Sequence, residues 1–476
     1  MRLAVIGAGI VGALIARELC RYEGEVLLFE REAEVGWGVT KANSGIVHGG
    51  FHDPPNTDRA RFCVQGNAMY EELCRELDVP FLRIGAYVLA LSEKELPVLE
   101  ELHAQGEENG VPGLEIHSQA EVLAREPNVN PKVLFGLWSP TVGITEPWAV
   151  ALAAVENAVA NGLELHLSEE ITGIRVEKGR VQEVKTLKGR YPVDAVVNAA
   201  GLFADHVAAM AGLSQLMLFP RRGEYVLLDK AAEGLVRSVV FPAPSEKSKG
   251  ILVLPTIDGG ILLGPTAEDL SPEAREATET TPEGLKKVVE GAKRLVPKVD
   301  PSFAIKTFAG LRPESPQEDF VVGETRVKGF FQAAAMRSPG LTAAPAIAKW
   351  LACEVMASEL SLNRKGSFDP IRKGIPRVAE LPEAEWEELI RKDPRYGRIV
   401  CFCNRVTEGE IVEAIRRGAR SLDGVKFRTR AGFGRCQGAF CTDRILAILS
   451  GELGVPPEKA SLRGPGSPLV MGKVRP

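Results

Sequence analysis

The stretch Arg2-Leu3-Ala4-Val5-Ile6-Gly7-Ala8-Gly9-Ile10-Val11-Gly12 decides the fold of this chain. Residues 2–6 form a short apolar run, which is typical of a buried strand. Apolar residues recur with helical spacing over residues 10–21, and residues 25–30 are strand-like again. A strand, a helix and a second strand within about 30 residues predict the βαβ unit of a doubly wound α/β fold.

Three glycines and one acidic residue in this unit indicate a ligand-binding site. Gly7 permits a tight turn, Gly9 lets the backbone approach a pyrophosphate, and Gly12 lets helix and strand pack closely. The N-terminus of the helix adds unpaired N–H groups that favour phosphate. Glu30 ends the second strand, where a carboxylate accepts hydrogen bonds from a ribose. These residues predict a dinucleotide site, and the alternative is a glycine-lined turn without a ligand.

Composition excludes several classes of protein. The chain has 476 residues, of which 45% are hydrophobic and 25% are charged, as in soluble globular proteins. Its formal net charge of −5 argues against nucleic acid as a main partner. No segment approaches the roughly 20 uncharged apolar residues of a membrane span. The structured glycine spacing of the first apolar run does not suit a secretory signal, so we expect a cytoplasmic protein.

The order of predicted elements indicates two interleaved lobes, because nucleotide-binding elements recur around strand-rich inserts. The predicted class is α/β plus α+β, with a Rossmann-like dinucleotide-binding lobe, a β-rich substrate lobe and a small cysteine-rich C-terminal module. The first 360 residues hold the two lobes, and the expected boundaries are as follows: dinucleotide-binding lobe about 1–80, 145–215 and 310–360; substrate lobe about 81–144 and 216–309; linker 361–394; cysteine module 395–456; irregular tail 457–476.

A second loop of small residues, Thr40-Lys41-Ala42-Asn43-Ser44-Gly45-Ile46-Val47-His48-Gly49-Gly50, follows the second strand. It resembles the flavin-contacting loop of the D-amino-acid-oxidase-like FAD oxidoreductases. Within that superfamily it is most similar to FAD-linked glycerol-3-phosphate and L-2-hydroxyglutarate dehydrogenases. The resemblance implies that the dinucleotide is FAD and that Thr40, Asn43, Ser44 and Gly45 contact it.

Three later motifs extend the resemblance over about residues 1–360. Asn198-Ala199-Ala200-Gly201 resembles the family's second cofactor motif, which implies a cofactor contact at Ala200 and Gly201. Gly310-Leu311-Arg312-Pro313 resembles the substrate-side arginine turn. Arg337-Ser338-Pro339-Gly340-Leu341-Thr342 resembles the segment that meets the flavin, which implies contacts at Gly340, Leu341 and Thr342.

Two residues are candidates for catalysis. His48 lies in the glycine-rich loop expected against the flavin, where it could take a hydroxyl proton as general base. The alternatives for His48 are a flavin-orienting role or a covalent link to the flavin. Arg312 stands in a turn that suits a bidentate grip on phosphate or carboxylate, with an ordinary salt bridge as the alternative. Arg221 and Arg222 form a second cationic segment at a strand start.

Four cysteines cluster near the C-terminus. Cys401-Phe402-Cys403 is followed after 32 residues by Cys436 and then Cys441. Two close thiolate pairs can hold Zn²⁺ or an iron–sulfur cluster, and the one-residue spacing of the first pair departs from common zinc knuckles. A redox disulfide is a further alternative. The run resembles the bacterioferritin-associated-ferredoxin-like domain of anaerobic glycerol-3-phosphate dehydrogenases, which implies a [2Fe–2S] cluster.

The expected activity is FAD-dependent oxidation of a small anionic substrate, with sn-glycerol 3-phosphate going to dihydroxyacetone phosphate. A cluster that accepts single electrons implies an electron-accepting protein subunit, either a flavoprotein or an iron–sulfur protein, and we also expect an oligomer. One alternative substrate is L-2-hydroxyglutarate or another 2-hydroxy or amino acid. A different alternative is a non-catalytic electron-transfer flavoprotein subunit.

Overall fold

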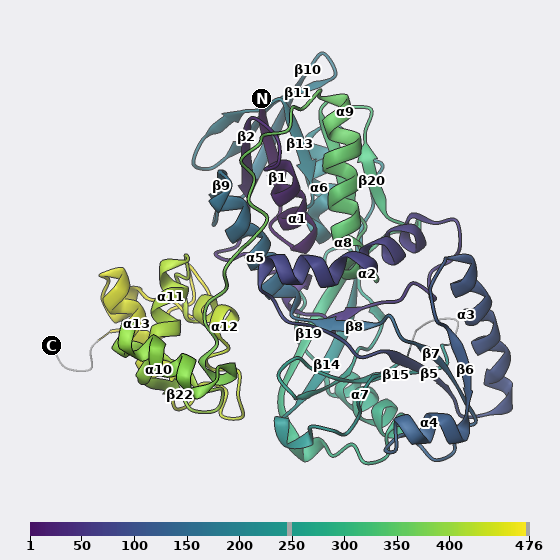
Figure 1. Cartoon of the computed structure of the whole chain (residues 1–476). Helices are drawn as coiled ribbons and strands as arrows, with labels where there is room; N and C mark the ends of the chain where they lie inside the picture. The colour runs from purple at the N-terminus through teal and green to yellow at the C-terminus, as the bar shows by residue number, and fades with distance from the viewer. Residues whose placement is uncertain (245–249, 473–476) are drawn as a thin grey trace.

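The computed structural model describes residues 1–244 and 250–472 and divides into two interleaved lobes and a C-terminal module (Figure 1). Residues 245–249 of the predicted substrate lobe and 473–476 of the predicted tail lie outside the described residues. The chain crosses between the lobes several times, so neither lobe is continuous in sequence. The predicted fold class is confirmed.

The first lobe is built on a six-stranded sheet whose order is β20-β21-β13-β1-β2-β9. Pairing is parallel except between β20 and β21. Apolar side chains fill both faces of β1, as expected for a central parallel strand covered by helices. The strands are β1 (Arg2–Ile6), β2 (Glu25–Phe29), β9 (Leu163–His166), β13 (Ala195–Asn198), β20 (Val321–Glu324) and β21 (Phe330–Ala334).

Helices cover both faces of this sheet. The side chain of Thr57 caps α2 by accepting the N–H of Ala60. The helix α8 continues through a π-helical segment. The helices are α1 (Ile10–Leu19), α2 (Asp58–Leu77), α5 (Pro147–Ala160), α6 (Ala204–Met210), α8 (Gly340–Lys349), η6 (Trp350–Met356) and α9 (Ala357–Glu359), with 3₁₀ turns η1 (Val39–Lys41) and η3 (Gly201–Phe203).

The second lobe is a larger, mostly antiparallel sheet of order β18-β14-β17-β16-β15-β5-β7-β6, with β19 also paired to β14. Its strands are β5 (Ala86–Ala90), β6 (Glu115–Ser118), β7 (Phe135–Ser139), β14 (Phe219–Leu228), β15 (Val239–Pro242), β16 (Leu252–Pro255), β17 (Ile261–Gly264), β18 (Glu268–Asp269) and β19 (Ala304–Glu314). The helices α3 (Leu96–Glu108), α4 (Gln119–Arg125) and α7 (Pro282–Leu295) pack on it, with 3₁₀ turns η2 (Glu93–Glu95), η4 (Lys230–Ala232) and η5 (Pro301–Phe303).

Two small sheets complete the lobes. One joins the lobes through β3 (Ile46–Val47), β8 (Gly143–Thr145) and β4 (Phe81–Arg83), and the other extends the first lobe through β10 (Ile171–Glu177), β11 (Arg180–Thr186) and β12 (Arg190–Pro192). The predicted lobe boundary at residue 310 falls inside β19. Because β19 pairs with β14 along its length, the second lobe extends to about residue 314.

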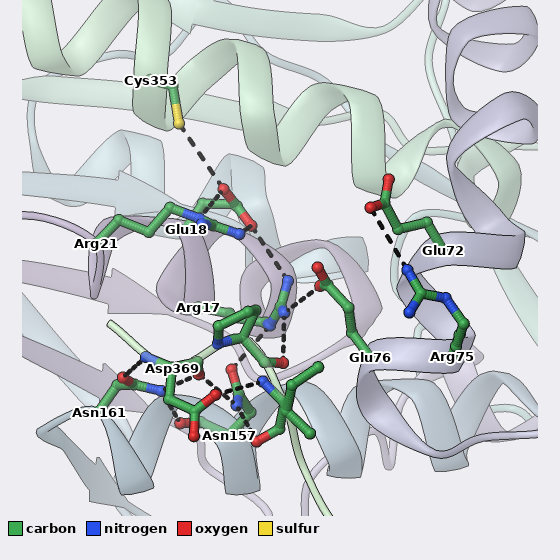
Figure 2. A network of polar contacts seen from close by, with 12 residues as sticks. Arg17, Glu18, Arg21, Glu72, Arg75, Glu76, Asn157, Asn161, Cys353 and Asp369 are labelled. Carbon is green, nitrogen blue, oxygen red and sulfur yellow. Dashed lines mark hydrogen bonds and ion pairs between the residues drawn. The ribbon is translucent and has the colours of Figure 1, made fainter. Parts of the chain in front are cut away.

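The start of the predicted linker is bound to the first lobe. Arg17 of α1 is 2% exposed, and its guanidinium contacts Glu76 at 2.6 Å and the Pro370 carbonyl at 3.0 Å. Asn157 of α5 and Asn161, which follows the helix, each donate to the Asp369 carbonyl (Figure 2). These contacts hold the chain along α1, α2 and α5 before it reaches the C-terminal module. This part of the linker is therefore packed against the first lobe.

The C-terminal module has its own hydrophobic core around Ile411, Val425 and Leu449. The predicted linker is not irregular throughout, because it contains η7 (Val378–Glu380) and α10 (Glu383–Lys392). The remaining elements are η8 (Pro394–Gly397), β22 (Ile399–Cys401), β23 (Val406–Thr407), α11 (Glu408–Arg416), α12 (Leu422–Thr429), α13 (Thr442–Leu453) and η9 (Pro457–Lys459). The tail folds back, since the N–H groups of Leu422 and Asp423 donate to the Ser461 and Leu462 carbonyls.

Candidate functional site

The glycine turn between β1 and α1 has the close approaches that the sequence predicts. Gly7 has a φ of +98°, and a Cβ there would lie 2.5 Å from the carbonyl oxygen of Ala199. A Cβ on Gly12 would overlap the Gly7 carbonyl, so Gly12 serves helix packing. Gly9 lies open to the cavity beside Thr40, whose hydroxyl accepts the N–H of Ile10 at 3.0 Å. This turn fits a bound pyrophosphate.

Glu30 lies at the end of β2 and lines the cavity beside the glycine turn. Its carboxylate accepts the N–H groups of Ala8 at 2.8 Å and Glu32 at 2.9 Å. Burial raises the pKa of Glu30, although the two N–H groups oppose that rise. The position suits contact with a ribose, and the same carboxylate also fastens the turn that holds the phosphates.

The second loop contains both cavity-lining and supporting residues. Ser44 and Gly45 line the cavity, and a Cβ on Gly45 would meet the Thr145 carbonyl oxygen at 2.6 Å. Asn43 also lines the cavity, but its side-chain amide donates to the carbonyls of Val39 and Thr40 while its oxygen accepts the N–H of Gly45. Asn43 therefore folds the loop with its side-chain polar atoms.

The predicted residues of α8 divide in the same way. Gly340 and Leu341 line the cavity, whereas Thr342 is fully buried behind it. The Thr342 hydroxyl accepts the N–H of His48 at 2.8 Å. Ala200 and Gly201 line the cavity beside the first glycine turn. Thr342 and Gly12 thus support the segments that face the cavity, Gly12 through the helix packing that the sequence predicts.

These segments surround one cavity of about 2360 Å³ that runs between the two lobes. Its volume exceeds the 300–1,000 Å³ of ordinary small-molecule pockets, so it has room for a dinucleotide and a substrate together. His48 and Arg312 both line it, although they lie in different lobes. The two candidate catalytic residues are therefore brought to one space by the interleaved fold.

Arg312 on β19 is the cation best placed to receive an anion. One guanidinium nitrogen donates to the Thr266 carbonyl at 2.9 Å, and its Nε is buried without a hydrogen-bond partner among the described residues. Nearby arginines have acidic partners: Arg337 lies 2.9 Å from Glu314, and Arg221 pairs with Asp269. Burial lowers the pKa of Arg337. Arg312 therefore keeps its charge available to the cavity.

His48 is held at both ends of its peptide unit. Its N–H donates to Thr342, and its carbonyl accepts the side-chain amide of Asn67 at 2.8 Å. Its ring is 6.4 Å from the ring of His52 and 6.0 Å from that of Phe241, measured between centroids. The half-buried imidazole at the cavity wall is thus fixed in place by α2, α8 and β15.

The four clustered cysteines come together at one edge of the module. Cys401 ends β22, Cys441 precedes α13, and both are buried, whereas Cys403 is exposed. The sulfurs of Cys403 and Cys436 are 3.7 Å apart. Two thiolates on one tetrahedral metal with bonds of about 2.3 Å are separated by nearly that distance.

The other two cysteines are also neighbours. Burial and the adjacent Cys401 raise the pKa of the Cys441 thiol to about 12. Within residues 1–244 and 250–472, no group of three or more His, Cys, Asp or Glu side chains is arranged to hold a single metal ion. Four cysteines in two pairs supply the thiolate ligands that a [2Fe–2S] cluster uses.

Comparisons with known proteins agree with this geometry. A family model described as FAD dependent oxidoreductase matches residues 2–354. The chain belongs to this family. A second model, the BFD-like [2Fe-2S] binding domain, matches residues 399–450 of this FAD-dependent oxidoreductase. The predicted cofactors, FAD and a [2Fe–2S] cluster, are confirmed.

Several relatives of this FAD-dependent oxidoreductase have related names. A glycerol 3-phosphate dehydrogenase of Caloramator mitchellensis is 44% identical, covering 99% of this chain and 98% of the relative. A glycerol 3-phosphate oxidase of Mycoplasma pneumoniae is 32% identical, covering 72% and 92%. The solved dithionite-reduced L-alpha-glycerophosphate oxidase from Mycoplasma pneumoniae with FAD bound superposes with a TM-score of 0.73 at 28% identity, covering 78% and 98%.

The cysteine module is docked on both lobes, a contact that sequence reasoning did not predict. Arg428 of α12 forms a buried ion pair with Glu34 at 2.7 Å. Arg430 pairs with Asp258 and lies 3.6 Å from Glu146. In Figure 1, α12 is the module helix that lies beside α5.

Aromatic rings fill the same interface. Trp148 of α5 stacks on Phe433 with centroids 5.8 Å apart and meets the edge of Phe427 at 5.5 Å. Lys306 lies over the Phe433 ring, and burial lowers the pKa of Lys306 to about 8. The cavity that holds the glycine turn extends past Phe433 to Cys403. The cysteine site therefore opens toward the cofactor cavity.

Proposed function

We propose that this FAD-dependent oxidoreductase oxidises sn-glycerol 3-phosphate to dihydroxyacetone phosphate and passes the electrons through its [2Fe–2S] cluster to a partner protein. The names of its relatives, two of which are a glycerol 3-phosphate dehydrogenase and a glycerol 3-phosphate oxidase, support this substrate. One observation carries the proposal: a cation without an acidic partner among the described residues and a fixed imidazole line the same cavity.

Arg312 binds the phosphate of the substrate. A dianionic group satisfies the buried Nε that has no partner among the described residues, and a guanidinium offers it two parallel hydrogen bonds. Arg337 lies on the same cavity wall and adds positive charge, although Glu314 shares it. The ion pair with Glu314 fixes the position of Arg337, and Arg312 has no acidic partner among the described residues.

His48 is the general base. Bound FAD supplies a two-electron acceptor for hydride, and the cluster supplies a one-electron store. His48 takes the proton of the hydroxyl on the carbon that is oxidised, which requires a neutral imidazole at the cavity wall. Thr342 and Asn67 hold the backbone of His48 so that its ring keeps that position.

The cofactor-holding residues divide between contact and support. Gly7, Gly9, Glu30 and the first turn of α1 hold the pyrophosphate and a ribose, and Thr40, Ser44, Gly45, Ala200, Gly201, Gly340 and Leu341 line the remaining cofactor space. Cys401, Cys403, Cys436 and Cys441 would hold the [2Fe–2S] cluster, with Cys403 and Cys436 as one close pair. Gly12, Asn43 and Thr342 keep these segments in place.

A substrate screen tests the proposal. The holoprotein is assayed with glycerol 3-phosphate, L-2-hydroxyglutarate and amino acids, using an artificial dye as electron acceptor. We expect turnover with glycerol 3-phosphate. Relatives named L-2-hydroxyglutarate dehydrogenase are 29% identical over about half of this chain, so exclusive turnover of that carboxylate is the informative opposite result. That result would mean that Arg312 binds a carboxylate of the substrate and not a phosphate.

Substitution of Arg312 separates phosphate binding from chemistry. Arg312→Lys keeps the charge but loses the bidentate grip, so we expect KM for glycerol 3-phosphate to rise about tenfold to a hundredfold while kcat changes less. Arg326→Lys is the matched control, because Arg326 is exposed and donates only to the Gly212 carbonyl. An unchanged KM in Arg312→Lys would remove Arg312 from the substrate site.

A further inference from the structure

Two phenylalanines beside the candidate cluster ligands face solvent. Phe402 stands between Cys401 and Cys403 and is 66% exposed, and Phe440 precedes Cys441 and is 77% exposed. Among the described phenylalanines the next most exposed is Phe303, at 38%. Folding alone does not favour this exposure, and exposed aromatic residues are enriched at protein contacts.

Two exposed arginines accompany the two phenylalanines. Residues 395–456 carry eleven Lys and Arg side chains against six Asp and Glu, and four of the arginines, Arg417, Arg428, Arg430 and Arg435, pair with acids of the two lobes. Arg405 and Arg444 are exposed, and Arg444 lies over the Phe402 ring at 5.8 Å. Neither arginine forms an ion pair within the described part of the chain, and each donates to a backbone carbonyl. Asp443 is the exposed acid next to Arg444.

One side of the cysteine site faces the cofactor cavity and the other side faces solvent. Cys403 and Asn404 line the cavity that leads to the glycine turn, so electrons can enter from that side. Phe402 and Phe440 flank the same cysteines but face away into solvent. The cysteine site can therefore receive electrons on the side of the cavity and pass them to a partner on the side of the two phenylalanines.

We propose that Phe402, Arg405, Phe440 and Arg444 form a docking face for an acidic protein that carries a one-electron cofactor. The inference rests on the proposed function and specifies its partner. Opposite charge favours encounter with an acidic protein, and the two rings supply the apolar centre of a small, transient interface. Each substrate releases two electrons, so two acceptor molecules are reduced in turn, one electron each, and two protons are released.

Binding of a probe protein tests the docking face without turnover. The oxidised holoprotein is titrated by calorimetry with the soluble domain of an acidic b-type cytochrome, at low and at high salt, and with a basic c-type cytochrome as the contrasting probe. We expect binding of the acidic cytochrome that weakens with salt, and no binding of the basic one. Tighter binding of the basic cytochrome, or binding insensitive to salt, would overturn the proposal.

Charge reversal locates the face. We expect Arg405→Glu with Arg444→Glu to weaken binding of the acidic cytochrome about tenfold or more and to slow its reduction by the same factor, with dye reduction unchanged. Arg416→Glu is the control, because Arg416 is exposed at the far end of α11. Equal effects of the two changes would mean that only the net charge matters. Phe440→Ala, with its cluster absorbance checked, should weaken binding at all salt concentrations.

Two further outcomes are distinguishable. If sedimentation shows a dimer that Phe440→Ala dissociates, the face joins two copies of this chain and the acidic partner is rejected. If anaerobic glycerol 3-phosphate leaves flavin and cluster oxidised, the proposed function fails whatever the cytochrome does. If both centres are reduced and the charge reversals have no effect, the docking face alone fails.

Discussion

The cofactor cavity and the cysteine site assemble in opposite ways. The cavity takes residues from the first glycine turn, the second loop, β19 and α8, which are separated by up to some 300 residues of sequence. The cysteine site takes all four candidate ligands from residues 401–441 of one small module with its own core. The cavity lies mainly between the two lobes and extends to Cys403, whereas the cysteine site also reaches solvent at Cys403. Substrate chemistry therefore depends on the interleaved fold, and electron exit depends on a surface.

The largest effect should come from removing a cluster ligand. Cys436→Ser takes away a thiolate that lies 3.7 Å from the sulfur of Cys403, so iron is lost. We expect reduction of a protein acceptor to fall to background while glycerol 3-phosphate still bleaches the flavin at the wild-type rate. Iron content and anaerobic flavin absorbance check this. Cys353→Ser is the control, because Cys353 is a half-buried thiol on η6.

If delivery to the acceptor survives in Cys436→Ser, the cysteine site is not on the electron path. Flavin reduction in the cofactor cavity and electron delivery to the acceptor would then proceed without the cysteine site.

The complementary change acts on the cavity. His48→Gln keeps a hydrogen-bonding side chain but removes the base, so we expect kcat for glycerol 3-phosphate to fall about 10²–10⁴-fold. Reduction of the cluster by dithionite should be unchanged, because the cysteine module is intact. His103→Gln is the matched control, since His103 lies on α3 and does not line the cavity. A kcat equal to that of the wild type would assign the proton to another group.

The next largest effect should come from weakening the contact between the cysteine module and the lobes. Arg430→Ala leaves Asp258 and Glu146 without this cation at a largely buried interface, and breaking such a pair costs on the order of 3–5 kcal/mol. We expect the module to loosen, with slower electron delivery and faster proteolysis within residues 361–394. Substrate bleaching of the flavin should keep its rate. Arg420→Ala is the control, because Arg420 is exposed and contacts only backbone carbonyls of its own module.

Delivery at the wild-type rate from Arg430→Ala would show that docking of the module onto α5 has no part in electron transfer.

The smallest expected effect is a pH dependence of the module. Burial raises the pKa of Glu410 to about 7, against the N–H and hydroxyl of Thr407, which donate to its carboxylate. The folded pKa lies above the unfolded one, so this stability is fully present below about pH 4.5 and is lost as the pH rises through about 7, amounting to at most about 3 kcal/mol.

Thermal unfolding measures this term. Between about pH 5 and pH 8, the melting temperature of the wild-type module should fall relative to that of Glu410→Gln, whose amide keeps the cap without titrating. Parallel curves for the two proteins would show that Glu410 is ionised in both states.

The same contrast explains what the sequence could reveal. The glycine turn and the cysteine pairs are local patterns, because neighbouring residues build them, and both were predictable. The supporting roles of Thr342 and Asn43 were not, because they depend on hydrogen bonds that form only when loop and helix meet. The docked module escaped prediction for the same reason, since Arg428 and Glu34 are almost 400 residues apart. Arg337 lies within a motif that is visible in the sequence, but its pairing with Glu314 could be seen only in the folded structure.

The structure also carries no candidate membrane span, since none of the described helices is long and apolar enough.

The most direct test of the central claim, that the cavity feeds the cysteine site, is anaerobic rapid mixing of the oxidised holoprotein with glycerol 3-phosphate. Flavin absorbance and the paramagnetic signal of the reduced cluster are followed in time. The account predicts that the flavin is bleached first and that the cluster signal then grows at the expense of the electrons stored there. A flavin that is bleached while the cluster stays oxidised, with its iron intact, would contradict it.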